Sequence, residues 1–202
     1  MSDPAERNLT PEAYAAQAQR ERVLGQRAAT VWLTGLSGAG KTTIARALEQ
    51  ALLHEGRACT VLDGDNLRAG LNADLGFSAA ERAENLRRVS HVASLMNDAG
   101  LIVIAAFIAP LRAAREAARA VVGAERFVEV YLSAPVEACR ERDPKGLYAR
   151  ADAGELPEFT GVSAPYEAPE AAELVLDTSV LGLGECVARL LRVLEARVAI
   201  PE

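Results

Sequence analysis

The stretch Gly35-Leu-Ser-Gly-Ala-Gly40-Lys41-Thr42-Thr43 has the residue types and spacing of a loop that binds nucleotide phosphates. A short apolar run over 31–33 precedes it, and the apolar residues after it recur at the spacing of one helical face. Glycines let successive backbone N–H groups point at one phosphate, and a helix amino terminus adds partial positive charge. We therefore expect Lys41 to reach the β- and γ-phosphates and Thr42 to bind Mg²⁺. The alternative is a glycine-rich turn that binds no ligand.

Lysine is rare in this chain, which contains 20 arginines but only two lysines, Lys41 and Lys145. The lysine ammonium is a compact point charge with rotatable donors, whereas the arginine guanidinium is a planar fork, so the two differ at a phosphate. Lys41 is explained by the glycine-rich loop. Lys145 is therefore a candidate for a second contact with a phosphoryl group, with an accident of composition as the alternative.

Acidic residues follow the second apolar run, where Asp63 and Asp65 flank Gly64. The run over 101–105 is followed by no acid, so a metal-positioning carboxylate must come from Asp63, Asp65 or Asp177. One acid could orient Mg²⁺ and one could accept a proton from an attacking hydroxyl. An Asp-Gly turn with solvated carboxylates is the alternative.

Arginines and one amide could hold a second, anionic substrate. Arg68, Arg82, Asn85 and Arg88 fall within 66–88, and arginine is the usual fork for phosphate or sulfate oxygens. A solvated helix face would also be rich in arginine, so the spacing alone leaves both interpretations open. Phe77 could stack on a base or belong to the core.

The elements that must position these residues alternate between strand and helix. We predict an α/β fold of the P-loop NTPase type, an open parallel β-sheet flanked by helices on both faces. In such sheets ligands bind at the carboxyl ends of the strands. The predicted strands are 31–33, 59–62, 101–105, 127–132 and 173–176. Helices are expected over 10–24, after the glycine-rich loop, and over 78–99, 111–121, 135–142 and 184–198.

The stretch 143–169 is rich in proline and glycine and also holds Tyr148, Phe159 and Tyr166. A loop of this length in a tight domain is usually functional, so we predict a lid over the active site, with a surface insertion as the alternative. Residues 1–28 are predicted to be a polar, partly helical amino-terminal extension, and residues 29–202 the domain with the phosphate loop.

Composition excludes several classes of protein. A net charge of −6 argues against a broad nucleic-acid footprint. The longest apolar run, 101–108, is too short to span a bilayer, and we expect no signal peptide and no membrane association. Cys59, Cys139 and Cys186 are scattered and expected to be reduced. The chain is expected to be cytoplasmic.

Five further segments resemble adenylylsulfate kinase: Asp63-Gly-Asp-Asn-Leu-Arg68, Gly70-Leu-Asn-x-Asp-Leu-Gly-Phe-Ser78, Arg82-x-Glu-Asn-Leu-Arg-Arg88, Arg142-Asp-Pro-Lys-Gly-Leu-Tyr148, and Phe159-Thr-Gly161 with Pro165-Tyr-Glu-Ala-Pro169. The similarity runs in order from about residue 31 to 177. It implies phosphoryl transfer from MgATP to the 3′-hydroxyl of adenosine 5′-phosphosulfate, in sulfate assimilation. It also implies a homodimer and leaves open an association with ATP sulfurylase.

The resemblance also implies site residues. Catalytic roles would fall to Asp63, Lys41 and Lys145, and metal binding to Thr42 and Asp63. ATP would be bound by Gly35, Leu36, Ser37, Gly38, Ala39, Gly40, Lys41, Thr42, Thr43, Arg142 and Thr178. The acceptor would be bound by Asp63, Asp65, Arg68, Phe77, Arg82, Asn85, Ile108, Ala109, Lys145, Gly146, Leu147 and Phe159, with its adenine stacked between Phe77 and Phe159.

One position departs from the family pattern. The motif after the third strand usually reads Ile-Ser-Pro, with a serine that is phosphorylated in some members, but here it is Ile108-Ala109-Pro110. We therefore predict direct in-line transfer without a phosphoserine. Two alternatives remain open: another small-molecule P-loop kinase, or a catalytically silent nucleotide-binding module.

Overall fold

Runs of apolar residues form the central strands of a five-stranded parallel sheet with the order β2-β3-β1-β4-β5. In this computed structural model, which describes residues 16–200, every residue of β1 and β3 is buried. Such strands are covered on both faces, which explains why they are continuously apolar rather than alternating. The strands are β1 (Thr30–Thr34), β2 (Cys59–Asp63), β3 (Ile102–Ala106), β4 (Phe127–Leu132) and β5 (Leu174–Leu176).

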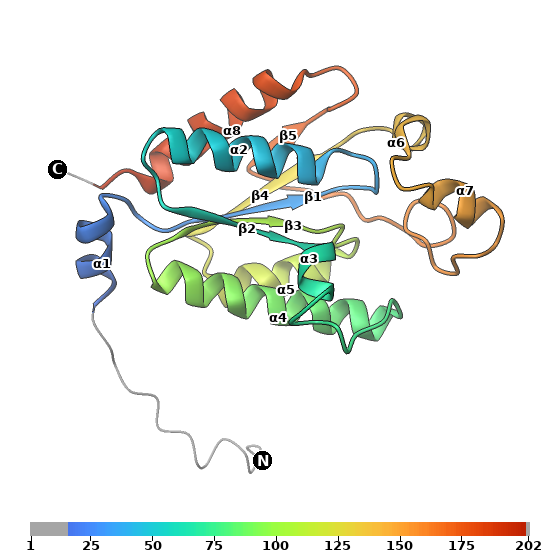
Figure 1. Ribbon diagram of the computed structural model, residues 1–202, viewed down its shortest axis with the longest axis horizontal. Helices are drawn as coiled ribbons and strands as arrows, with labels where there is room; N and C mark the ends of the chain where they lie inside the picture. Colours follow the sequence, from blue (N-terminus) through green and yellow to red (C-terminus); the bar gives the residue numbers. More distant parts are fainter. Residues whose placement is uncertain (1–15, 201–202) are drawn as a thin grey trace, which may run out of the picture.

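Helices cover both faces of the sheet (Figure 1). Helices α2 (Lys41–His54) and α8 (Leu183–Val198) pack on one face, with Leu48, Leu52, Leu190 and Leu194 in the core beneath them. Helices α4 (Ala79–Asp98) and α5 (Arg112–Val122) pack on the other, where Trp32 stacks on Phe107 and Phe127. The predicted fold class is therefore confirmed.

Helix α4 begins where the sequence places its start. The Ser78 hydroxyl accepts a hydrogen bond from the Glu81 backbone N–H, and the Glu81 carboxylate accepts one from the Ser78 N–H. These reciprocal bonds form a capping box, which satisfies N–H groups that the first turn would otherwise leave unpaired. The helix thereby fixes the direction in which the predicted acceptor residues of its first two turns point.

The short elements were harder to predict. Helix α3 (Gly64–Arg68) and helix α7 (Leu147–Asp152) were not predicted, whereas α6 (Val136–Arg142) was. Helix α1 (Gln17–Leu24) lies within the predicted helix 10–24; Ala16 precedes it as its N-cap, and residues 10–15 lie outside the described residues. The division between residues 28 and 29 stays a prediction.

The connections after the strands gather at one edge of the sheet. In Figure 1 the loop from β1 to α2, helix α3 and the segment with α6 and α7 lie together at the carboxyl ends of the strands. Helix α1 lies at the opposite end (Figure 1). Ligand sites of open parallel sheets occur at the carboxyl edge, so this edge is the place to look for chemistry.

Candidate active site

The loop between β1 and α2 holds a conformation that requires glycine. Gly35 and Gly38 have φ angles of 147° and 77°. A Cβ atom on either would lie 2.7 Å from a backbone oxygen, that of Leu132 or Cys139. Because real Cβ atoms do not approach so closely, β4 and helix α6 could not pack here against any other residue. The loop ends at Gly40, which caps the amino terminus of α2.

Lys41, the first residue of α2, turns back over this loop. Its Nζ donates to the carbonyl oxygens of Gly35 and Leu36, each at 2.8 Å. Burial lowers the pKa of its ammonium to about 8, although the nearby Asp63 and Asp65 act in the opposite direction. The lysine is therefore held against the backbone that would enclose a phosphate, with its proton loosely bound.

Two side chains with oxygen atoms that could bind a metal ion, Thr42 and Asp63, meet beside the loop. The Thr42 hydroxyl donates to Oδ2 of Asp63 at 2.8 Å, and Asp63 is 8% exposed. The other carboxylate oxygen accepts the backbone N–H of Asp65 at 3.0 Å, so Asp63 caps α3. The unpredicted helix α3 is thus the element that fixes this carboxylate. It also turns Asp65 outward, where its side chain is exposed.

Arg142 and Thr178 lie on the far side of the same loop. Arg142 donates to the Gly38 carbonyl at 3.3 Å and to the Thr178 carbonyl at 2.6 Å. The Thr178 hydroxyl donates to the carbonyl of Ala39 at 2.9 Å. The structure therefore brings both residues to the phosphate loop, and their contact with the ATP base stays a prediction. Thr43 is exposed in the first turn of α2.

The stretch 143–169, the predicted lid, contacts the phosphate loop through Tyr148. Asp143 accepts the backbone N–H groups of Leu147, Tyr148 and Ala149 and so nucleates α7, which follows Gly146. The Tyr148 hydroxyl donates to the Ser37 carbonyl at 2.9 Å. No role for Tyr148 could be predicted from the sequence, because this hydroxyl contact depends on how the lid packs against the loop.

Lys145 forms an ion pair with Asp65, which joins the lid to the end of β2 across the site. Both side chains are more than half exposed, at 55% and 71%. Exposed pairs contribute about 0–1 kcal/mol, so the lysine is held weakly. Thus the two lysines of the chain and the Asp63/Asp65 pair lie around one space.

Arg68 and Arg82 converge beside this space. The Arg68 guanidinium lies 4.3 Å from the centre of the exposed Phe77 ring and donates to the carbonyls of Leu75 and Gly76. Burial first, and Arg82 second, lowers the pKa of Arg68. Arg82 donates to the lid, at Thr160 Oγ1 (3.1 Å) and the Glu158 carbonyl (3.0 Å). Two cations held this closely favour an anion between them.

Asn85 is buried on α4 and is oriented by a residue that the sequence analysis did not single out. Asn72 Nδ2 donates to Asn85 Oδ1 at 2.9 Å, and Asn72 itself is fully buried. The Asn85 carbonyl oxygen is thereby used, which leaves its N–H donors for other partners. Only the tertiary packing of the loop 69–77 on α4 reveals this pair.

The two predicted stacking residues differ in environment. Phe77 is 67% exposed, whereas Phe159 is 8% exposed and packs edge-on against Tyr148 at 5.1 Å between ring centres. Phe77 is open to a base, but Phe159 would have to leave Tyr148 to offer a face. Stacking of an adenine between them stays a prediction.

Ile108 and Ala109 form the loop after β3. The Thr34 hydroxyl donates to the Ile108 carbonyl at 2.6 Å, and Ala109 is buried with a positive φ of 43°. This loop lies at the same edge of the sheet as the phosphate loop, since β3 pairs with β1 in parallel.

Comparison with known proteins identifies relatives over most of the chain. A profile of the adenylylsulphate kinase family matches residues 27–177. The adenylyl-sulfate kinase of Geotalea uraniireducens is 52% identical over 175 residues, 87% of this chain and 84% of the relative. That of Shewanella amazonensis is 55% identical over 172 residues, 85% of this chain and 87% of the relative.

Solved structures give the same answer. The Mycobacterium tuberculosis APS kinase CysC, in complex with AMPPNP and APS, has a TM-score of 0.80 and 49% identity, covering 84% of this chain and 98% of that one. A hexameric APS kinase from Thiobacillus denitrificans has a TM-score of 0.63 and 38% identity, covering 85% of this chain and 29% of that one. A sugar kinase from Janibacter sp., at 21% identity and a TM-score of 0.59, shares the fold alone.

Proposed function

Because the chain belongs to the adenylylsulphate kinase family, we propose that its site transfers the γ-phosphoryl group of ATP to the 3′-hydroxyl of adenosine 5′-phosphosulfate. The products are ADP and 3′-phosphoadenosine 5′-phosphosulfate. The chain is thus an ATP-dependent phosphotransferase of sulfate assimilation. The M. tuberculosis relative, solved with AMPPNP and APS, supports the same two substrates here.

One juxtaposition supports this proposal most strongly. Contacts between Thr42 and Asp63, and between Asp65 and Lys145, join the phosphate loop, the end of β2 and the lid around one space. Phosphoryl transfer needs donor, acceptor and charge-stabilising groups in line within such a space. A site that only bound a nucleotide would have no use for the second lysine or the acid pair.

On the donor side, the backbone of residues 35–43 would enclose the ATP phosphates, with Lys41 against the β- and γ-phosphates. Arg142 and Thr178, which contact the loop at Gly38 and Ala39, would border the ATP base. These two side chains already bond to the loop backbone, so they would stabilise the loop in the shape that binds phosphate.

Mg²⁺ is the cation that the donor set fits. Thr42 Oγ1 and Asp63 Oδ2 lie 2.8 Å apart, and Mg²⁺ takes one or two protein oxygens together with water and phosphate oxygens. No cluster of three or more His, Cys, Asp or Glu suited to a metal occurs in residues 16–200. When bound, Mg²⁺ would neutralise charge on the phosphates.

On the acceptor side, Arg68, Arg82 and Asn85 would hold the phosphosulfate group, and Phe77 would stack on its adenine, opposite Phe159 when the lid rearranges. Ile108, Ala109, Gly146 and Leu147 would complete the pocket. Asp63 would accept the 3′-hydroxyl proton or organise the metal, with Asp65 beside it, and Lys145 would meet charge that develops on the transferring group.

Transfer would be direct. Ala109 carries no hydroxyl, so no phosphoenzyme can form at the position where the family motif has serine. Incubation with ATP alone followed by intact-mass measurement is expected to show no stable added phosphate. A stoichiometric mass increase of one phosphoryl group would overturn direct transfer.

Assembly and location are proposed from the family resemblance. We expect a homodimer in the cytoplasm, which light scattering would detect as twice the mass of the chain. Association with ATP sulfurylase would be tested by co-purification of the two proteins. No helix within residues 16–200 is both long and apolar enough to cross a membrane.

The decisive experiment is a coupled ADP-release assay with adenosine 5′-phosphosulfate, gluconate and nucleosides as acceptors. Turnover only with adenosine 5′-phosphosulfate is expected. Preference for another acceptor would favour a different small-molecule kinase, and no turnover under saturating MgATP would favour a silent binding module.

A further inference from the structure

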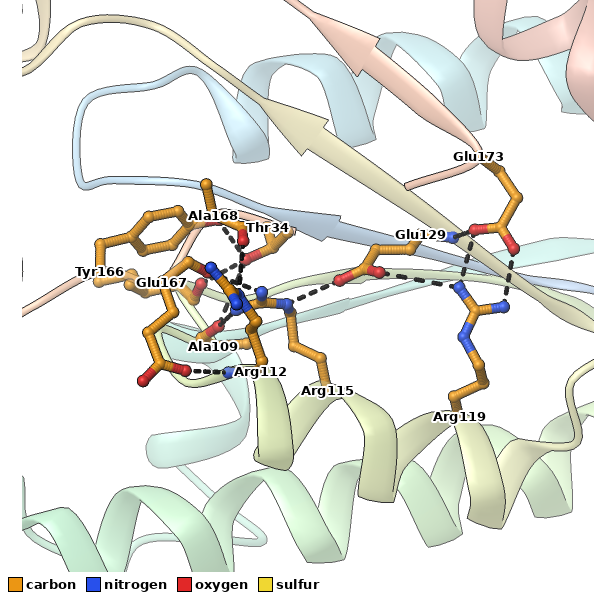
Figure 2. A network of polar contacts seen from close by, with 11 residues as sticks. Thr34, Ala109, Arg112, Arg115, Arg119, Glu129, Tyr166, Glu167, Ala168 and Glu173 are labelled. Atoms are coloured by element: carbon orange, nitrogen blue, oxygen red, sulfur yellow. Dashed lines mark hydrogen bonds and ion pairs between the residues drawn. The ribbon is translucent and has the colours of Figure 1, made fainter. Parts of the chain in front are cut away.

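One buried guanidinium on α5 binds strand β4, the loop after β3 and the carboxyl-terminal end of the lid (Figure 2). Arg115 is 3% exposed. Its Nε donates to Glu129 of β4 at 2.6 Å, and its two terminal nitrogens donate to the carbonyls of Ala109 and Glu167, each at 2.7 Å. Because the guanidinium is rigid and planar, the three acceptors are held in fixed relative positions.

The first of these carbonyls belongs to the loop after β3. Ala109 has a left-handed backbone with φ of 43°, which residues with a side chain rarely adopt. Such a conformation persists only where its surroundings over-determine it. Here Arg115 binds the Ala109 carbonyl while Thr34 binds the Ile108 carbonyl at 2.6 Å. The strained loop is thus held by its own backbone oxygens.

The second carbonyl belongs to the carboxyl-terminal end of the lid, residues 166–168. The Glu167 N–H donates to the Pro110 carbonyl at 2.9 Å, and the Glu167 carboxylate accepts the Arg112 N–H at 2.7 Å. The Tyr166 and Thr34 hydroxyls lie 2.9 Å apart (Figure 2). This end of the lid is therefore fastened to the residue that directly precedes the phosphate loop.

The amino-terminal half of the lid is held differently. Its ion pairs, Lys145–Asp65, Arg150–Glu155 and Arg140–Asp152, have side chains that are 39–71% exposed, whereas the Arg115–Glu129 pair is 3% and 11% exposed. A buried, fully bonded pair is costly to break, while exposed pairs open readily. The two ends of the lid therefore differ in their charged contacts. Residues 166–168 form the firm end, whereas the amino-terminal half is held by Tyr148, which is 2% exposed, and by ion pairs that open readily.

We propose that Arg115 is a positioning residue for the acceptor: through Ala109 and Glu167 it sets the loop over 108–110 and the fixed end of the lid relative to each other. The inference rests on the proposed function, which places the acceptor against Ile108 and Ala109. Arg115 itself donates to Glu129, Ala109 and Glu167 and not to residues 35–43, so its loss should affect the acceptor more than ATP.

The chain provides a matched control on the same helix. Arg119 binds Glu173 at 2.7 and 2.8 Å and approaches Glu129 at 3.7 Å, yet it contacts neither the loop nor the lid. Arg115→Met and Arg119→Met each remove a cation from one network (Figure 2). Both variants should unfold at a lower denaturant concentration than the parent chain. The fluorescence of Trp32, the single tryptophan, would report the unfolding.

Kinetics should separate the two variants. For Arg115→Met we expect kcat/KM for adenosine 5′-phosphosulfate to fall roughly 10- to 100-fold, with KM for ATP within about twofold of the parent. Arg115→Lys should recover part of the loss, and Arg119→Met should keep both constants. Equal kinetic constants in Arg115→Met and Arg119→Met, or an equal loss for both substrates, would overturn the proposal.

Two further measurements keep the test informative. Tyr166→Phe removes only the hydroxyl beside Thr34 and is expected to raise KM for the acceptor a few-fold. This variant takes the place of Arg115→Met if Arg115→Met does not fold. An unchanged KM for the acceptor in Tyr166→Phe would count against the proposal. Hydrogen–deuterium exchange with AMPPNP bound, which requires no turnover, should be faster at the Glu167 amide in Arg115→Met than in Arg119→Met, because this N–H donates to the Pro110 carbonyl at the firm end. Equal rates would contradict the firm end, whereas an inactive parent chain would instead refute the proposed function.

Discussion

The donor and acceptor sides of the site are built in different ways. The donor side is a continuous stretch, residues 35–43, whose shape comes from backbone conformation and close packing at Gly35 and Gly38. The acceptor side is assembled from α3, the loop 69–77, α4, the loop after β3 and the lid, joined by side chains such as Arg68, Arg82 and Asn72. A local motif can be recognised from its spacing, but an assembled pocket cannot.

The difference has an energetic side as well. Donor contacts are mostly backbone groups already in place, so nucleotide binding should need little rearrangement. Acceptor contacts include exposed ion pairs and a lid with one firm end, so acceptor binding should involve movement. Variants on the two sides are therefore expected to separate in their effects on KM for the two substrates.

Asp63→Asn should have the largest effect, because Asp63 serves both sides. The amide keeps the shape: its oxygen can accept from the Asp65 N–H, and its NH2 group can donate to the Thr42 hydroxyl, so the fold should survive. Loss of the charge should lower kcat roughly 10²- to 10⁴-fold by removing a base or metal organiser. Steady-state kinetics over a range of Mg²⁺ would distinguish the roles, because partial recovery at high Mg²⁺ indicates metal organisation.

Asp177→Asn is the matched control for this variant. Asp177 also follows a strand, but its carboxylate accepts hydrogen bonds from the Ser179 N–H and hydroxyl. Its kcat should stay near that of the parent chain. If Asp177→Asn were the slower of the two, the metal and base duties would belong to the end of β5.

Lys145→Ala is expected to come next, with kcat lower by roughly 100-fold and KM for ATP nearly unchanged, because a positioned cation at the transferring group is lost. Arg150→Ala removes another lid cation, whose ion pair with Glu155 lies within the lid, and should have little effect. Asp65→Asn separates two possible roles of Lys145: its ion pair with Asp65 and its contact with the transferring phosphoryl group. If it slowed the reaction as much as Lys145→Ala, the ion pair rather than the phosphoryl contact would matter.

Much of the scaffold could be predicted from the sequence because its signals are local. Continuous apolar runs specify buried parallel strands, and the Ser78/Glu81 pair specifies the start of α4. The short helices α3 and α7 escaped prediction because they are only five and six residues long. They form through capping by Asp63 and Asp143, a signal too brief to separate from a turn.

The candidate site divides along the same line. Spacing and the scarcity of lysine predicted a phosphate loop and a role for Lys145, and the family resemblance supplied the predicted acceptor residues. Arg115, Asn72 and the Tyr148 hydroxyl could not be found in this way, because their partners are 6 to 111 residues distant in the chain. Whether an arginine on an alanine-rich helix faces solvent or a buried carboxylate depends on which strand lies beside it.

A pH titration of nucleotide binding probes the donor side alone. Lys41 has a pKa of about 8 in the free protein, and phosphate binding would favour the charged form and raise it. Affinity for AMPPNP is then constant below pH 8 and falls as pH rises above it, by about tenfold per unit until the pKa of the complex is reached. Calorimetry between pH 7 and 9.5 measures this.

The control is Lys41→Arg, whose guanidinium stays charged throughout that range. It should bind more weakly because the planar fork does not fit the space, but with a flat profile above pH 8. A parent profile as flat as that of Lys41→Arg would mean that the Lys41 ammonium does not contact the bound phosphates.

Tyr148→Phe should have the smallest effect and tests where the two sides meet. The Tyr148 hydroxyl donates to the Ser37 carbonyl at 2.9 Å, and burial raises the pKa of this hydroxyl, so it keeps its proton at working pH. Losing one such bond costs about 1 kcal/mol, roughly a fivefold weaker nucleotide affinity. Tyr131→Phe, on β4, is the control, since its hydroxyl has no hydrogen-bond partner within residues 16–200 and its ring keeps its stacking on Tyr166.

If the lid only carried acceptor groups, Tyr148→Phe would change KM for adenosine 5′-phosphosulfate and leave that for ATP untouched. A change confined to ATP would instead mean that α7 stabilises the phosphate loop, so that the lid belongs to the donor side at its moving end and to the acceptor side at its fixed one.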